Sequence, residues 1–441
     1  MQRRFRNMLR VGLVLPSVGV LSLAACDFDV DNPGAILETD LNTIEAVNAL
    51  VTGMSSDFSE EYDGIAFVGA RATDEMAGSG SYNETNFFRM GIINAEDVNG
   101  IWEGIQRARW VAEDGIRRLR DDIVDYAFDG NPLTARAYLF AGLANRVVGE
   151  SFCYGVVSAD APLGGGSEDA KPPSESFQRA INMLSDALTH ATTAGDQMLI
   201  DAAHGARAQA YVGLGDWTSA VAEAGQVPTD FTYSAIYSDN SGRENNEIYL
   251  ETFNRPEMSV FDTYASTFDP PDPRTPYTNC PVTGTCSASG ADGITEYWRQ
   301  EKYDERGSEI PVVKGTEMRL IEAEAALRSS NLTGAMSGIN AVRQFHGLTD
   351  LSATTIDEAW IHLDHERMLT LWLEGRRMHD LRRWDEEDRS TLPGVMFLRG
   401  QIPLAGDAMD PSISKRASCI PIAFSECLSN PNLSGSAACG S

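Results

Sequence analysis

Apolar residues recur at helical spacing over the last third of the chain. The pattern starts at Met318, breaks at a short Ser-Ser-Asn segment and resumes at Ala335. Such spacing predicts two helices, and a break this short makes them antiparallel neighbours. Thr355 and Glu358, three residues apart, have the pattern of a capping box, which predicts the start of a third helix.

The same spacing occurs in the first half of the chain. It predicts a short helix after Asn42 and longer amphipathic helices over about 102–124, 133–148 and 177–188. Residues 57–100 lose this period and gather Gly, Ser and Asn, so we expect a loop there.

Closely spaced prolines in residues 228–312 exclude a continuous helix and allow short strands at most. We therefore expect a mainly α fold with a few short strands, in which loop-rich segments extend from a helical frame. Within one domain over 41–441, the expected frame covers about 41–56, 101–226 and 313–389, and the loop-rich segments cover about 57–100, 228–312 and 390–441. Ordered loops on a rigid frame commonly carry binding function, so a ligand is expected on these segments.

Two segments of the chain resemble each other. Residues 208–221 align without gaps to residues 323–336. In each, an alanine-lined helix ends at a turn and a second helix begins at an alanine. Gly215 or Asn331 can take the left-handed conformation that ends such a helix. The pair resembles a tetratricopeptide unit, which favours a helical repeat scaffold.

Charged residues interrupt the apolar face of the third predicted helix. At about 100° per residue, Arg367 and Glu374 fall in the same sector as Trp360. A buried charge has to be paired and hydrogen-bonded. We interpret this stretch as an internal ion network that fixes how helices dock, with a carboxylate binding site as the alternative. The candidate members are Glu366, Arg367, Glu374, Arg376 and Arg377.

An ordered series of motifs runs through the same part of the chain. It comprises Arg-Leu-Ile-Glu-Ala-Glu-Ala from Arg319, Ile-Asn-Ala-Val-Arg from Ile339, Glu366-Arg367, Glu374-Gly-Arg, Asp380-Leu-Arg-Arg-Trp, Cys419-Ile-Pro-Ile, Glu426 and Asn430-Pro-Asn-Leu. This series resembles the SusD/RagB family of outer-membrane lipoproteins, which capture nutrients beside a TonB-dependent (SusC-like) transporter. The resemblance implies a non-enzymatic protein that binds an oligomeric nutrient, a glycan by default or a peptide, and delivers it to the transporter.

The N-terminus has the pattern of a targeting segment. Four arginines precede an apolar stretch that Pro16 interrupts and that is too short to span a membrane, so residues 1–25 are expected to be a signal peptide. The stretch ends Leu-Ala-Ala-Cys26, which resembles a bacterial lipobox and predicts lipidation of the Cys26 thiol. Residues 26–40 are then an acidic tether. We expect outer-membrane anchoring through acyl chains, with the domain facing the cell surface.

Charge and motif content narrow the function further. The formal net charge of −29 disfavours nucleic acid and anionic lipid as partners. No GxSxG, P-loop or GxGxxG motif occurs, so no cofactor is expected. His362, His365 and Glu366 could face one metal ion, but Arg367 places a fixed positive charge directly beside them, so no metal is expected either. Two other classes stay open. One is a surface glycoside hydrolase with a carboxyl pair formed in space, and the other is an assembly scaffold without a nutrient ligand.

Two loop segments combine aromatic rings with polar groups, which suits a sugar ligand. They are residues 73–88 and 295–299, with one arginine from the Pro-rich loop. Asp74 is included because Thr-Asp-Glu is similar to a family motif whose Asp lines the ligand face. The others are chosen from composition. The candidate ligand residues are Asp74, Tyr82, Asn83, Phe87, Arg274, Tyr297 and Trp298.

Six cysteines follow Cys26, and disulfides form outside the cytoplasm. Two local bonds are the simplest expectation, Cys280 with Cys286 and Cys419 with Cys427, although sequence does not fix connectivity. Zinc is the alternative, but these spacings are too wide for a paired CxxC site.

Overall fold

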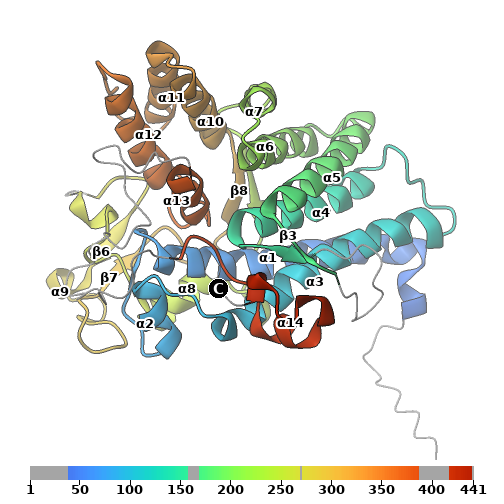
Figure 1. Cartoon of the computed structure of the whole chain (residues 1–441), viewed down its shortest axis with the longest axis horizontal. Coiled ribbons are helices and arrows are strands. Elements are labelled where there is room, and N and C mark those ends of the chain that lie inside the picture. Colours follow the sequence, from blue (N-terminus) through green and yellow to red (C-terminus); the bar gives the residue numbers. More distant parts are fainter. Residues whose placement is uncertain (1–37, 157–167, 269–270, 387–416, 440–441) are drawn as a thin grey trace, which may run out of the picture.

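The computed structural model describes residues 38–156, 168–268, 271–386 and 417–439 (Figure 1). The predicted signal peptide, Cys26 and nearly all of the tether lie outside these residues. Within them, no helix is both long and apolar enough to cross a membrane.

The molecule is mainly helical, and successive helices pack against one another as antiparallel pairs (Figure 1). The helices of the frame are α1 (Val47–Ala72), α3 (Asn99–Arg117), α4 (Pro132–Ser151), α5 (Pro173–Ala194), α6 (Gln197–Leu214), α7 (Trp217–Ala224), α10 (Gly315–Arg328), α11 (Leu332–Phe345), α12 (Ile356–Thr370) and α13 (Arg377–Glu386). Short helices α2 (Asn83–Arg89), α8 (Glu247–Tyr249), α9 (Cys280–Thr283) and α14 (Phe424–Ser429) lie outside the frame. The predicted helical repeat scaffold is confirmed.

The two similar segments form equivalent helix pairs, α6 with α7 and α10 with α11. Asp216 and Asn331 occupy equivalent positions, and each side chain accepts a hydrogen bond from the backbone three residues on, at 3.1 and 3.0 Å. These bonds cap α7 and α11. Gly215 ends α6 in the left-handed conformation, whereas Ser330 takes that role before α11. The expectation that Asn331 adopts it was therefore wrong.

α1 corrects the prediction of a loop from residue 57. The helix continues to Ala72, and every residue from Ile65 to Ala72 is buried. A helical stretch that is buried on all sides has no polar stripe, so residues 65–72 lack the period of an amphipathic helix. Its glycines and serines then gave the false appearance of a loop.

α12 begins at the predicted capping box but ends at Thr370. Leu373 and Gly375 then adopt positive φ values of 60° and 69°, which turn the chain into α13. Glu374 therefore lies in a turn, not on the helix face where about 100° per residue would place it.

Short antiparallel strand pairs complete the described part of the fold, and the first of them ties the Pro-rich segment to the first loop-rich segment. They are β1 (Ala77–Gly78) with β5 (Met258–Ser259), β2 (Gly155–Val156) with β3 (Ala170–Lys171), β4 (Thr232–Ala235) with β8 (Ile310–Lys314), and β6 (Tyr277–Asn279) with β7 (Trp298–Gln300). The pair β4–β8 joins the two ends of the Pro-rich segment. Because α7 also packs against α10, the frame continues past the point where this segment leaves it.

Three disulfides are present in the described part of the chain. Cys280 is bonded to Cys286 across six positions, Cys153 to Cys419 across 266, and Cys427 to Cys439 across 12. The expected bond between Cys419 and Cys427 was therefore wrong.

The tail docks beside the end of α4, which explains the observed pairing. The Ile420 N–H donates to the Ser151 carbonyl at 2.7 Å, and the Cys153 N–H donates to the Ile420 carbonyl at 2.9 Å. These bonds bring Cys419 next to Cys153, a neighbour far away in sequence.

Candidate ligand-binding site

The first and second loop-rich segments lie side by side (Figure 1). β1 from the first pairs with β5 from the second, and the Ser79 N–H donates to the Glu257 carbonyl at 2.9 Å. Gly290 packs directly on Ser79, where a Cβ would come within 2.4 Å of the serine Cβ, so only glycine fits. The two segments therefore form one continuous surface on the helical frame.

Aromatic rings are exposed on this surface. Tyr82 and Phe87 of the first segment are 43% and 38% exposed, and Asn83 is exposed at the start of α2. Arg255 of the second segment donates from Nη1 to the Tyr82 hydroxyl at 3.1 Å. Rings held beside polar groups offer both the apolar faces and the hydrogen bonds that a sugar requires.

Trp298 on β7 provides a further half-buried ring. It stacks on Tyr277 with centroids 5.4 Å apart and meets Phe261 edge-on at 5.6 Å. Its Nε1–H donates to Glu296 Oε2 at 3.3 Å. This packing fixes the orientation of the indole ring before any ligand arrives.

A cavity of about 350 Å³ opens between the two segments and α1. Phe88 and Asp97 line it from the first segment, and residues from Gly242 to Glu247 line it from the second. α1 contributes its floor, including Arg71. The volume is at the lower end of the range for ligand pockets, roughly 300–1,000 Å³.

Asp74 does not reach this surface. The residue is 1% exposed, and its two carboxylate oxygens accept hydrogen bonds from Arg377 Nε and Nη2 at 2.7 and 2.8 Å. The placement of Asp74 on the ligand face is therefore wrong for this chain. Its carboxylate neutralises a buried arginine instead.

Arg274 and Tyr297 are also internal. Arg274 is 7% exposed and pairs with Asp272 at 2.9 Å and Glu366 at 2.5 Å. Tyr297 is 2% exposed and donates its hydroxyl to the Thr252 carbonyl, and burial raises its pKa. Both side chains hold the second segment in place. Of the predicted ligand residues, Tyr82, Asn83, Phe87 and Trp298 stay accessible.

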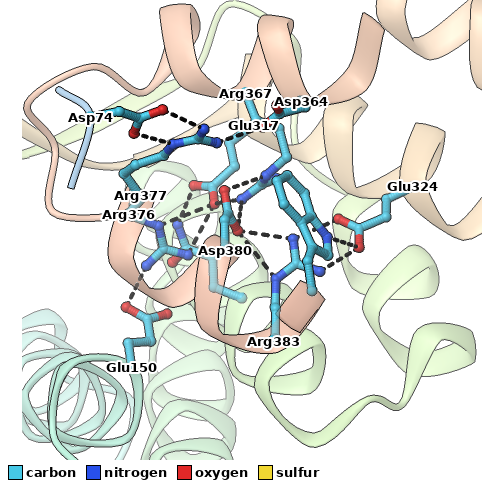
Figure 2. A network of polar contacts seen from close by, with 12 residues as sticks. Asp74, Glu150, Glu317, Glu324, Asp364, Arg367, Arg376, Arg377, Asp380 and Arg383 are labelled. Carbon is cyan, nitrogen blue, oxygen red and sulfur yellow. Dashed lines mark hydrogen bonds and ion pairs between the residues drawn. The ribbon is translucent and has the colours of Figure 1, made fainter. Parts of the chain in front are cut away.

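Figure 2 shows an extended ion network between the helices, which includes Asp74. In it, Arg367 donates from Nε to Asp380 at 2.7 Å, and Arg376 bonds to Glu317 at 3.0 Å. Arg377 also donates to Asp364 at 2.6 Å. All of these side chains are buried. The network joins α10, α12 and α13 to α4 through Glu150, which accepts a hydrogen bond from Arg376.

The two glutamates of the predicted network also have partners. Glu366 accepts from Arg274 and Arg343, each at 2.5 Å. Glu374 pairs with Lys302 at 2.7 Å and Lys314 at 2.8 Å. Because every one of these charges has an internal partner, the arrangement is a structural lattice that leaves no carboxylate free for a ligand.

A metal site is absent among the described residues, where no group of three His, Cys, Asp or Glu side chains could hold an ion. His362 Nε2 lies 3.1 Å from the Ser352 carbonyl, and His365 packs against Tyr264. The two histidines thus have structural neighbours of their own.

The sequence profile of the SusD family matches residues 173–434, more than half of the chain. The chain belongs to the SusD family. Solved structures of other members share the fold of this SusD-family protein. A SusD superfamily protein from Bacteroides vulgatus ATCC 8482 is 18% identical, with a TM-score of 0.65 over 88% of this chain and 97% of that one.

Two further structures are similar to this SusD-family protein. A SusD-like carbohydrate binding protein from Bacteroides vulgatus ATCC 8482 is 13% identical, with a TM-score of 0.65 over 89% of this chain and 97% of that one. A laminarin binding SusD-like protein is 16% identical, with a TM-score of 0.65 over 87% and 97%. A search of curated proteins finds no match.

Sequence reasoning missed the side chains that line the cavity of this SusD-family protein. Phe67 and Arg71 belong to the stretch taken as a loop, and Glu247 lies far from them in sequence. The sequence signal for this cavity was Arg71, a charged residue within the apolar run from Ile65 to Ala72.

Glu75 gives the stability of this protein a testable pH dependence. It is 2% exposed, its Oε1 accepts the Leu373 N–H at 2.7 Å, and its Oε2 has no hydrogen-bond partner in the described part. Burial raises its pKa from 4.5 to about 8, although the Leu373 N–H opposes the shift. The folded state therefore keeps a proton that the unfolded state releases, and stability falls as pH rises through this window.

Glu75→Gln should remove this contribution. From pH 5 to pH 7, we expect the free energy of unfolding of the unmodified protein to fall by about 2 to 3 kcal/mol relative to that of the variant. The reason is that each pH unit in this window changes it by about 1.4 kcal/mol. Urea unfolding of both proteins at the two pH values measures the difference. An identical pH dependence in the two proteins would show that Glu75 is ionised in the folded state.

Proposed function

We propose that this protein is a non-enzymatic binding lipoprotein of the outer membrane. It captures an oligomeric nutrient, a glycan in preference to a peptide, and delivers it to a TonB-dependent transporter. The observation that carries the proposal is the single surface formed by two segments far apart in sequence, one of which exposes Tyr82 and Phe87 while the other holds the ordered ring of Trp298. The carbohydrate and laminarin binding of two similar proteins supports a glycan as the ligand.

The packing supports a rigid capture surface. β1–β5 and β4–β8 fasten the loop-rich segments, and the ion network holds the helices beneath them. A preformed surface avoids the entropic cost of ordering loops when the ligand binds. Sugar rings then stack on the exposed aromatics while neighbouring Asn83 and Arg255 offer hydrogen bonds to hydroxyls.

The double variant Tyr82→Ala/Trp298→Ala is expected to bind glycan at least about 10-fold more weakly, because each lost ring contact costs roughly 0.5–1.5 kcal/mol beyond its buried area. Calorimetry with laminarihexaose, followed by other neutral oligosaccharides and short peptides, measures the loss. Phe345→Ala is the control, since Phe345 is 50% exposed on α11, outside both segments.

Each contrary result has a distinct meaning. Equal affinity of the double variant and the unmodified protein would place the ligand elsewhere. Shortened oligosaccharides after incubation would favour a glycoside hydrolase. Binding of protein partners alone would favour an assembly scaffold.

Anchoring and partnership are tested through Cys26. Cys26→Ala should leave the protein without acyl chains, because the thiol is the acceptor, and should shift it from the membrane to the soluble fraction. Mass spectrometry of the mature protein and fractionation measure both effects. The unmodified protein, extracted from outer membranes, should co-purify with a large β-barrel. An unlipidated mature protein, or one without such a partner, would contradict this part of the proposal.

A further inference from the structure

Arg71 stands out among the buried arginines of the described chain. It is 4% exposed, lines the cavity and forms no ion pair with any described carboxylate. Its Nη1 donates to Thr85 Oγ1 at 3.1 Å, while Nε has no hydrogen-bond partner. By contrast, Arg367, Arg376 and Arg377 each pair with carboxylates. A buried cation without a counter-ion is costly, and here it faces an open cavity.

Aromatic rings hold the Arg71 guanidinium in position. Its centre lies 3.8 Å from the Phe67 ring centroid and 4.7 Å from that of Phe88. Burial lowers the Arg71 pKa to about 9, although the charges of Glu84, Glu247 and Glu257 oppose the shift. A planar guanidinium fixed between two rings is oriented to donate to a carboxylate that enters the cavity.

Glu247 supplies an acceptor in the same cavity. Its backbone N–H donates to Asp63 Oδ2 at 2.7 Å, but its own carboxylate has no hydrogen bond or ion pair within the described ranges. Burial raises its pKa, although the charges of Arg255 and Arg71 oppose the shift, so a cation in direct contact would stabilise the carboxylate further. Glu247 and Arg71 are not joined to each other by an ion pair.

The remaining carboxylates around the cavity have partners. Glu60 pairs with Arg107 at 3.1 Å and with Arg243 at 2.6 Å. Asp63 accepts the Glu247 N–H, and Asp97 accepts from Asn94 Nδ2 at 2.9 Å. The available charges are therefore one cation and one anion. Phe67, Val68 and Ile101 form an apolar part of the cavity wall.

We propose that this cavity binds a free α-amino acid with an apolar side chain. Its carboxylate would accept from Arg71, its ammonium would donate to Glu247, and its side chain would pack on the apolar wall. A zwitterion satisfies both charges and adds no net charge to the cavity, whereas a simple anion would meet repulsion from the surrounding carboxylates. The inference is independent of glycan capture, because the cavity of about 350 Å³ is separate from the exposed aromatic rings and too small for an oligomer.

The test compares three ligands by calorimetry on the full-length protein: L-leucine, L-leucinamide and N-acetyl-L-leucine. Leucinamide lacks the carboxylate, and N-acetylleucine lacks the ammonium. Leucine should bind at least about 10-fold more tightly than either analogue, since each analogue loses one charge-assisted hydrogen bond.

Two variants assign each preference to one residue. Arg71→Met should abolish the preference for leucine over leucinamide, and Glu247→Gln should abolish the preference for leucine over N-acetylleucine. Arg120→Met is the control, because Arg120 forms an exposed pair with Asp121.

No binding of leucine, equal binding of the three ligands, or variants that keep both preferences would overturn the proposal. The ligand comparison uses the unaltered protein, so a variant that misfolds does not weaken the test. Binding of laminarihexaose in the same preparation reports separately on glycan capture. The two proposals can therefore fail independently.

Discussion

Replacing Asp380 with alanine is expected to lower the free energy of unfolding by about 3 to 5 kcal/mol, the usual cost of removing one partner from a buried ion pair. Asp380 accepts hydrogen bonds from Arg367 at 2.7 and 3.0 Å and from Arg383 at 2.9 and 3.2 Å. Both guanidiniums are buried and would lose this counter-ion at once. Nearby arginines hold the Asp380 pKa well below its usual range, although burial opposes them, so the carboxylate is charged at neutral pH.

Urea unfolding at pH 7 measures the change. Asp121→Ala is the matched control, because Asp121 pairs with Arg120 at 2.8 Å while both side chains are about half exposed (48% and 53%). Exposed pairs contribute about 0 to 1 kcal/mol. Equal losses in the two variants would mean that the network contributes no more than a surface pair.

Removing the disulfide between Cys153 and Cys419 is expected to lower the free energy of unfolding by about 5 kcal/mol on the chain-entropy account, because this bond closes a very long loop. The bond spans 266 positions, whereas Cys280–Cys286 spans six. Without the long bond, the unfolded chain gains much more freedom. The double variant Cys153→Ala/Cys419→Ala tests this expectation.

The control is Cys280→Ala/Cys286→Ala, which also removes one bond but should cost only about 2 kcal/mol. Denaturant unfolding of both variants gives the two values. A smaller loss from the long bond than from the short one would contradict the chain-entropy account for this protein.

The helical hairpins were predictable because their signals are local. α10, α11 and the start of α12 carry an apolar period and recognisable caps, and the structure has helices at each place. The continuation of α1 beyond residue 56 was missed, because burial of the stretch from Ile65 to Ala72 on every side erased that period. Its interior environment depends on the packing of other helices, which no local window of sequence contains.

The candidate site was likewise predictable where the signal is local and not where it depends on contacts between distant parts of the chain. Tyr82 and Trp298 were chosen from composition, and both lie on the surface that the two segments share. Asp74 was placed there by resemblance, but its pairing with Arg377 is a contact between distant parts of the chain. The cavity was not predicted at all, since Arg71 and Glu247 are far apart in sequence and line one cavity only in the folded molecule.

The ribbon of β4 and β8 has an evolutionary consequence. Thr232 is paired with Lys314, so the Pro-rich segment leaves the frame and returns to it at the same point. An excursion whose ends already meet can change length between them, provided that Arg274 and Lys302 are kept as partners of the buried Glu366 and Glu374. The exposed loops of this segment can therefore vary among descendants of this protein while the helical frame is inherited unchanged.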